Sequence, residues 1–367
     1  MAIELATKFQ PYTDEQFSTE SKKSMLTNQD FDWTGAHTVK IYKVTTAGMN
    51  DYGRTGPSGS NWSRYGAVES LDATTEEFTL KKDRSFTFAI DKLDTDETAQ
   101  QLQAASALAR QNRQVVIPEV DIYTYGVMCA KAGVKPAAVA LTSENIYPEI
   151  IEASKALDDA EVPETGRVLV VTPAVYQFMK KCKDITMETD IGNDMRLRGV
   201  IANLDGMSVQ KIPANRLPAG FGFMIAHPCA CVAPTKLEEY KIHQDPPGIS
   251  GSLVEGRICY DAFVLENKAN AIYYQAVQAN GLTVVSAAGS ASGKTAITVT
   301  PAKAAGKAYK YKVDAAVPAI GEDCSEWNAW DGSADITAAT GSTLVIVEVD
   351  GDNKSVKAGT ATVTARA

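Results

Sequence analysis

The sequence predicts an α+β body over residues 1 to 280, followed by an all-β sandwich over residues 282 to 367, and three observations support this division. A long polar segment with helical spacing begins at Asp94, directly after two short alternating strands. From Ser143 onward, short apolar strands alternate with amphipathic helical segments, which is typical of an α+β or α/β body. After Asn280 the composition shifts to Ala, Gly, Thr and Val, in short strands separated by Gly or Asp turns.

The N-terminal region predicts an arm, a strand and a loop. Residues 1 to 35 carry isolated aromatic side chains, too sparse for a core of their own, so we expect an arm that lies on a neighbouring subunit. Residues 37 to 44 alternate apolar and polar in the period of a half-buried strand. Residues 48 to 66 hold five glycines, which predicts a turn-rich tip. The stretch GRTGPSG lacks the Gly-Lys-Ser/Thr ending of a phosphate-binding loop, so a flexible tip is favoured.

The next segment predicts a two-stranded hairpin. Phe78 and Leu80 alternate on one strand, Phe86 and Phe88 alternate on the next, and the charged residues 81 to 84 separate them. A bare hairpin is marginal in water, so its aromatic face needs a cover that a neighbouring subunit would supply. We therefore expect Phe78, Leu80, Phe86 and Phe88 to be assembly residues.

A long helix is predicted after this hairpin. Asp94 and Glu97 have capping-box spacing, and acidic residues stabilise the positive end of a helix. Pro118 is expected to kink or restart the helix, and Gly133 to close it.

The rest of the body and the C-terminal domain are predicted to consist of short helices and strands. Predicted helices are SENIYPEIIEASKALDDA and AVYQFMKKC; predicted body strands are RVLVVTP, GMSVQKIP, GFGFMIAHPCACVAP, LEEYKIH and YDAFVLENKANAIYYQAV. The sandwich strands are LTVVS, TAITVTP, YKYKV, STLVIVEVD and GTATVTARA.

Composition narrows the function classes. The chain has 367 residues, of which 44% are hydrophobic and 22% charged, which is typical of a globular protein of two or three folding units. A net charge of -9 argues against a protein whose main task is gripping nucleic-acid phosphates. Six scattered cysteines favour reduced thiols, no apolar run is long enough to span a bilayer, and the start carries no secretion signal. We expect no membrane partner.

Catalytic, metal and cofactor chemistry has little support. His227, Cys229 and Cys231, with His243, admit a zinc site, but their apolar surroundings favour a buried strand. The carboxylates Asp91, Asp94, Asp96 and Glu97 admit general acid/base work, but helix capping explains them more simply. Because no hydrolase motif is present either, we expect no enzyme, metal or cofactor.

Two tryptophans of the C-terminal domain could have either of two roles, ligand binding or packing. Trp327 and Trp330 lie in the stretch WNAWDG, and exposed aromatic side chains on a sandwich loop can stack on surface glycans. Core or turn packing is the more common role of such residues.

Four short stretches of the sequence resemble those of a known protein family. FAIDKLDTDET, VVIPEVDIYTY, LVVTPAVYQFMKK and YDAFVLENKANAIY, in this order, resemble HK97-type major capsid proteins of tailed bacteriophages, particularly those of Gram-positive hosts. The resemblance covers roughly residues 1 to 280 and implies an HK97-like α+β capsid fold. It divides the chain into an N-terminal arm (1–35), an extended loop (36–92), a spine helix with the peripheral domain (93–139), an axial domain (140–250), return strands of the peripheral domain (251–280) and an appended immunoglobulin-like sandwich (282–367).

The resemblance also implies a function. It implies a subunit that assembles into hexamers and pentamers of an icosahedral shell around double-stranded DNA, with a portal and a separate scaffold protein, located in the virion and assembled in the host cytoplasm. Some relatives crosslink neighbouring subunits, for which Lys81, Lys82, Asn267 and Asn270 are candidates by segment alone. The alternatives are a surface or tail-associated adhesin whose sandwich binds glycans, and an encapsulin-like container.

Overall fold

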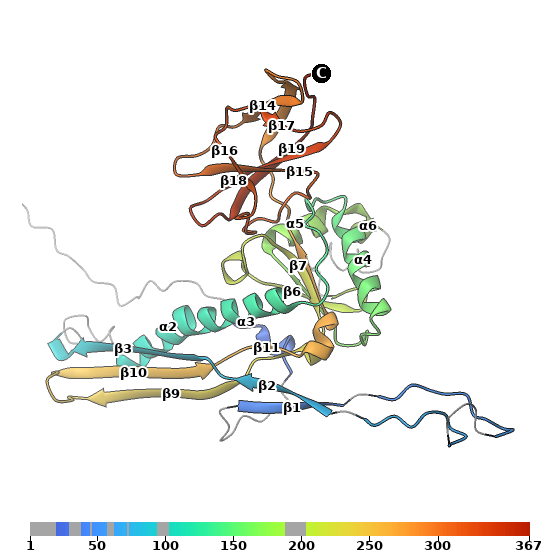
Figure 1. Ribbon diagram of the computed structural model, residues 1–367. Coiled ribbons are helices and arrows are strands. Elements are labelled where there is room, and N and C mark those ends of the chain that lie inside the picture. The colour runs from blue at the N-terminus through green and yellow to red at the C-terminus, as the bar shows by residue number, and fades with distance from the viewer. Residues whose placement is uncertain are drawn as a thin grey trace, which may run out of the picture. The chain divides into compact units, whose positions relative to one another are not determined.

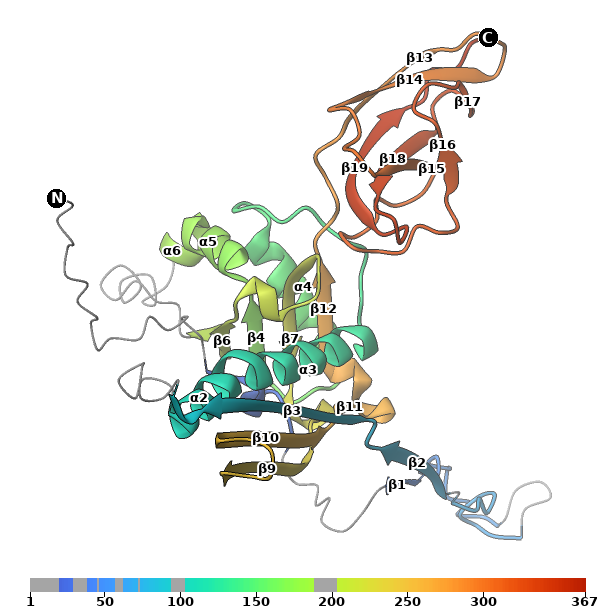
Figure 2. The same cartoon turned by 90° about the vertical axis from the view of Figure 1, so that its left-hand side faces the viewer.

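The computed structural model describes residues 20–28, 38–44, 46–56, 62–71, 73–93, 103–187 and 203–367. The chain divides into two compact units. One holds residues 30–91 and 234–261, and the other holds the remaining residues. Figures 1 and 2 show the elements of both.

The smaller unit contains a two-stranded antiparallel hairpin, β1 (Thr38–Val44) and β2 (Ala73–Thr79). All seven residues of each strand are paired, from Thr38 opposite Thr79 to Val44 opposite Ala73. The described residues between the strands form a long loop without helix or strand. The predicted strand at 37 to 44 and the predicted loop are therefore confirmed, and this loop projects from the end of the hairpin (Figure 1).

The same unit contains a three-stranded antiparallel sheet in the order β3-β10-β9. Its strands are β3 (Lys82–Asp91), β9 (Thr235–Gln244) and β10 (Gly251–Tyr260). The predicted hairpin between Phe78 and Ile90 is wrong, because β2 pairs with β1 whereas β3 pairs with β10. Only residues 80 and 81 separate the two sheets, and the Lys81 N–H donates to Asp261 Oδ2 at 2.8 Å. An alternating pattern specifies a strand but not its partner.

The larger unit is crossed by one long helical stretch. It runs through α2 (Ala104–Gln111), the π-helical segment η2 (Asn112–Val116) and α3 (Ile117–Lys131). Pro118 lies in the first turn of α3, directly after the π-helical residues, which agrees with the predicted restart of the helix at this proline. The predicted start at Asp94 lies outside the described residues, and the helix ends two residues before the predicted stop at Gly133.

A five-stranded mixed sheet forms the centre of the larger unit, in the order β12-β7-β4-β6-β5. Figure 2 labels β12, β7, β4 and β6. Strands β4 and β6 are parallel, and the other neighbours are antiparallel. Strands β4 and β7 are buried at every residue, and Ile150, Leu157 and Met179 of the helices are fully buried in the same core. The sheet's strands are β4 (Val168–Val171), β5 (Asn203–Leu204), β6 (Met207–Lys211), β7 (Phe221–Ala226) and β12 (Ile272–Ala276), and the helices are α4 (Ile146–Asp159), α5 (Pro173–Lys181) and α6 (Lys183–Met187).

Short elements complete this unit. Strands β8 (Cys231–Val232) and β11 (Phe263–Val264) pair with each other, and Asn28 of the N-terminal region bridges to Val232. The 3-10 turns are η1 (Lys23–Met25), η3 (Ala214–Arg216), η4 (Pro228–Ala230) and η5 (Glu266–Ala271).

The C-terminal domain consists of two antiparallel sheets, as the sequence predicts. The orders are β13-β14-β17 and β16-β15-β18-β19, and the core holds Val284 and Ile297 of the first sheet against Leu344 and Ile346 of the second. The strands are β13 (Thr283–Ala288), β14 (Lys294–Thr300), β15 (Ala308–Val313), β16 (Asn328–Trp330), β17 (Ile336–Thr337), β18 (Thr343–Val349) and β19 (Ser355–Thr362).

Two of the domain ranges expected from the sequence do not follow the sheets of the structure. Strand β9 falls in range 140–250, given to the axial domain, but pairs with β10 in the three-stranded sheet. Strand β12 falls in range 251–280, given to the return strands, but pairs with β7 in the five-stranded sheet. Long-range pairing decides sheet membership, and local sequence does not record it.

Candidate assembly surfaces

The loop between β1 and β2 exposes large apolar and aromatic side chains. Trp62 is 83% exposed, Tyr65 77% and Met49 102%. A soluble protein rarely leaves such side chains together in water without a partner. The loop nevertheless has internal order, because Gly53 N–H donates to Arg64 O at 2.8 Å and the rings of Tyr52 and Tyr65 meet edge to face at 5.0 Å. A partly ordered, apolar projection is suited to binding another protein.

Cross-strand ion pairs stabilise the hairpin that carries this loop. Lys40 pairs with Glu77 directly opposite, and Lys43 Nζ lies 3.3 Å from Glu76 Oε2. The hydrogen bond and charge of Glu77 raise the pKa of Lys40. The exposed Lys40–Glu77 pair contributes little to folding, but both pairs join the two strands and favour this register.

The three-stranded sheet has one apolar and one polar face. On the apolar face Phe86, Gly256 and Tyr240 lie opposite one another in register. The ring of Phe86 covers Gly256, so that a Cβ there would lie 2.3 Å from Cζ of the ring and 2.9 Å from Cδ1 of Tyr240. Phe86 also stacks on Phe88 with 6.2 Å between ring centroids. These aromatic side chains serve first to pack the sheet.

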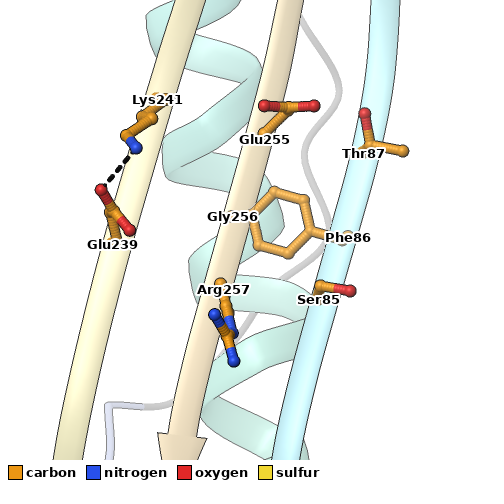
Figure 3. A pocket seen from close by; sticks show the side chains of 8 residues that line it. All are labelled: Ser85, Phe86, Thr87, Glu239, Lys241, Glu255, Gly256 and Arg257. Carbon is orange, nitrogen blue, oxygen red and sulfur yellow. Dashed lines mark ion pairs between the residues drawn. The ribbon is translucent and has the colours of Figure 1, made fainter.

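The polar face carries a shallow hollow of about 370 Å³ (Figure 3). Charges of both signs surround it: Lys241 Nζ lies 2.6 Å from Glu239 Oε1, and Arg257 donates two hydrogen bonds to Asp83. The hydrogen bonds from Arg257 hold the pKa of Asp83 below its ordinary value. Its lining residues are Ser85, Phe86, Thr87, Glu239, Lys241, Glu255, Gly256 and Arg257.

The structure places the four predicted assembly residues differently from the expectation. Phe78 and Leu80 are each only 7% exposed, and Phe86 and Phe88 are half-buried within the three-stranded sheet. Among the described residues, the exposed aromatic side chains are Tyr52, Trp62 and Tyr65 in the Gly-rich loop and Tyr42 in β1. The signal that could have found them was the cluster of Tyr52, Trp62 and Tyr65 among turn residues, where no core could form.

A buried charge pair anchors the N-terminal region within the larger unit. Arg216 Nη1 lies 2.9 Å from Asp121 Oδ2, and their side chains are 5% and 1% exposed. Ser21 donates its hydroxyl to the other carboxylate oxygen of Asp121 at 2.6 Å. Leu26, fully buried, joins the main core. Residues 20 to 28 are therefore fixed by both packing and charge, which sequence reasoning did not find.

Trp330 is a core residue, which agrees with the more common of the two roles considered from the sequence and does not support the alternative of a surface-ligand contact there. It is 7% exposed, its ring lies 5.6 Å from that of Tyr309, and its Nε1–H donates to Ala334 O at 2.7 Å. Trp327 is half-buried against a second small core, and Lys312 Nζ lies 6.0 Å from its ring centroid. The indole of Trp330 anchors the turn that leads to Ala334.

The other chemical candidates have structural partners. His227 Nδ1 accepts from Cys229 N–H at 3.2 Å, and Cys231 is fully buried, which raises the pKa of its thiol to about 12. Within the described ranges, no three His, Cys, Asp or Glu side chains gather as they would around a metal ion. Asp94, Asp96 and Glu97 lie outside the described residues. No helix in the described part of the chain is long and apolar enough to cross a membrane.

Comparison with solved structures identifies the fold as that of phage capsid proteins. A chain of Mycobacterium phage Che8 is 18% identical with a TM-score of 0.57, covering 74% of this chain and 96% of that chain. The capsid structure of cyanophage P-SCSP1u is 12% identical with a TM-score of 0.60, covering 74% and 92%. The mature capsid of bacteriophage PhiM1 is 14% identical with a TM-score of 0.56, covering 75% and 92%. The mixed α/β architecture thus agrees with the expected HK97-like capsid fold.

Sequence comparisons reach only the C-terminal domain. Residues 287–366 match the family of the S-layer protein SbsC C-terminal domain. No curated protein sequence matches the chain.

Proposed function

We propose that the chain is the major capsid subunit of a tailed phage with a Gram-positive host, and that its copies form hexamers and pentamers of an icosahedral shell around double-stranded DNA. In this role it is a structural protein of the virion and not an enzyme. It assembles in the host cytoplasm with a portal and a separate scaffold protein. Its C-terminal sandwich is immunoglobulin-like and lies outside the shell.

The exposed β1–β2 loop carries this proposal. Trp62 and Tyr65, 83% and 77% exposed, have no core of their own to enter, and a neighbouring copy would bury them. Specific protein interfaces bury roughly 1,200–2,000 Å² in total, and a projecting element gains such area from a neighbour more readily than a compact surface does. The ring contacts of a capsomer are head-to-tail, so a donor loop on one face must meet a different acceptor surface on the next copy.

A double substitution in the loop tests the proposal. Trp62→Ser with Tyr65→Ser removes two exposed aromatic side chains and should leave a folded subunit that no longer forms shells, as seen by electron microscopy. Val285→Ser in strand β13, which removes a 56% exposed apolar side chain from the sandwich, serves as the control and should assemble normally. Normal shells from the double variant would contradict the role of the loop.

Substitutions in the loop separate assembly from folding better than substitutions of Phe86 and Phe88 in β3. Replacing Phe86 and Phe88 by Ser would remove packing across Gly256 and Tyr240, so a loss of shells would not separate misfolding from failed assembly. Loop substitutions reduce this ambiguity because Trp62 and Tyr65 are largely exposed, and the ring contact that is lost, between Tyr65 and Tyr52, lies within the loop itself.

The two rival functions predict different results. An encapsulin-like container would form shells that take up a protein cargo and no DNA. An adhesin would remain monomeric and bind glycans through residues 282 to 367. Trp330 is buried, so of the two tryptophans only the half-buried Trp327 offers surface to a glycan.

A further inference from the structure

The chain leaves the body for the C-terminal domain with hydrogen bonds on both sides. After β12, Val277 N–H donates to Gly220 O at 2.7 Å and Gln278 N–H donates to Val139 O at 3.1 Å, both within the body. In the other direction, Ala279 N–H donates to Pro318 O at 2.9 Å, and Val277 O accepts from Ile320 N–H at 3.1 Å. The connection is thus a short segment that is hydrogen-bonded to the body on one side and to the C-terminal domain on the other.

The body and the C-terminal domain also touch at a position that tolerates no side chain. Gly220 has a φ of +71°, and a Cβ there would lie 2.3 Å from the carbonyl oxygen of Ile320. The next residue of the sandwich segment, Gly321, has its Cβ position 3.2 Å from Ala219 Cβ. Two backbones that approach this closely require glycine at the contact.

The contacting segment is equally fixed to its own domain. Residues 315 to 327 cover the outer face of the four-stranded sheet, where Val345, Val347 and Val349 are at most 1% exposed. Ala279 of the connection belongs to the same small core. Gly321 N–H donates to Ser355 O at 2.8 Å, and Ser355 N–H donates to Glu322 O at 2.9 Å. The segment is therefore bonded to strand β19 on one side and to the connection on the other.

We propose that the body surface formed by Gly220 and Val277 is a docking surface whose partner is segment 315–324 of the C-terminal domain. Relative motion is the usual behaviour of two domains joined by a linker. Here the linker is itself hydrogen-bonded to both domains, and its Ala279 is buried in the small core of the C-terminal domain. The sandwich is held in one orientation on its body, so every copy in an assembly would present it in the same way.

Hydrogen exchange on the full-length chain tests the docking. Amides of residues 277–279 and 320–321 should exchange far more slowly than those of loop 46–56. Gly220→Ala places a Cβ against Ile320 O and should speed exchange of both junction peptides about tenfold or more, while β4 and β7 stay protected. The control is Gly206→Ala, since Gly206 has a similar φ of +76° but nothing within 4 Å of its Cβ position. This control carries the same backbone strain and should leave the junction protected.

A second variant approaches the junction from the sandwich. Ser355 donates its hydroxyl to Ala319 O and accepts from Glu322 N–H, so Ser355→Ala should speed exchange at residues 319–322 and at 277–279 together. Fast exchange at the junction of the unmodified chain would overturn the proposal. So would equal protection in the Gly220→Ala and Gly206→Ala proteins, or an unchanged junction in Ser355→Ala.

Discussion

The ring of Phe86 lies across Gly256, and these two residues are directly paired in the ladder between β3 and β10. A glycine in the middle of a strand costs conformational entropy and leaves a gap in the side-chain row. Here the gap is filled by an aromatic ring from the neighbouring strand, which reaches across to Tyr240 with 6.1 Å between ring centroids. The pair explains why β10 carries glycine at its centre.

Gly256→Ala should destabilise the three-stranded sheet by about 1–3 kcal/mol, because the new methyl group forces Phe86 and Tyr240 out of their positions. Chemical denaturation followed by circular dichroism measures the change. Gly126→Ala is the control: this helical glycine of α3 has nothing within 4 Å of its Cβ position, and alanine should stabilise it by roughly 0.5–1 kcal/mol. An unchanged stability in Gly256→Ala would mean that the ring does not occupy the gap.

Asp121→Asn should destabilise the larger unit by about 3–5 kcal/mol, because Arg216 would keep its charge in a buried site without a compensating carboxylate. Thermal denaturation checks this, and limited proteolysis should show residues 20 to 28 released at the same time. Glu152→Gln changes an exposed pair with Lys155 and should alter stability by less than about 0.5 kcal/mol. Equal effects of the two substitutions would refute the anchoring role of the buried pair.

Trp330→Ala should destabilise the C-terminal domain by about 3–5 kcal/mol, since it removes a core indole and its hydrogen bond to Ala334. Calorimetry of the full-length chain is the measurement. Trp327→Ala, at a half-buried position, should cost less. A larger loss of stability from Trp327→Ala than from Trp330→Ala would mean that Trp327, and not Trp330, is the core residue.

The C-terminal domain should lose stability in acid. Hydrogen bonds from backbone N–H groups lower the pKa of Asp331 and Asp350, and the Ser290 hydroxyl lowers that of Asp335. Each folded-state pKa lies below the unfolded value near 3.8, so the stabilisation is present above that value and is lost as pH falls through the folded pKa. The melting temperature of the domain should be flat near neutrality and fall below about pH 4.

Substitutions identify the groups responsible. Asp331→Asn combined with Asp350→Asn should flatten this acid dependence, whereas Asp159→Asn at the end of α4 should not affect the sandwich. If the unmodified chain, the double variant and Asp159→Asn all lost stability over the same pH range, the acid transition would belong to other groups.

The sequence predicted the strands and helices better than it predicted which strands pair with each other. Strand β4 and helix α5 follow from RVLVVTP and AVYQFMKK, because a buried apolar run and a proline at the first helical turn are local signals. The partner of β3 did not follow, since the alternation of Phe86 and Phe88 fits either β2 or β10. In the structure the Phe86 ring is accommodated by Gly256 of β10, a residue that is far away in sequence.

The candidate surfaces were predictable to the same degree. The Gly-rich loop was read as a tip, yet its aromatic residues were not recognised as the exposed set. Trp330 was ambiguous because WNAWDG fits a core turn as well as a ligand loop, and the bond to Ala334 decides between them. The contact between Ser21 and Asp121 joins residues a hundred positions apart, and no local pattern records it.

Electron microscopy of the purified full-length chain at high concentration, alone and with a scaffold protein, shows whether the chain assembles as a capsid subunit. A capsid subunit should form closed shells or six-fold rings under at least one of these conditions. Persistent monomers under all of them, including with scaffold, would contradict the proposed function.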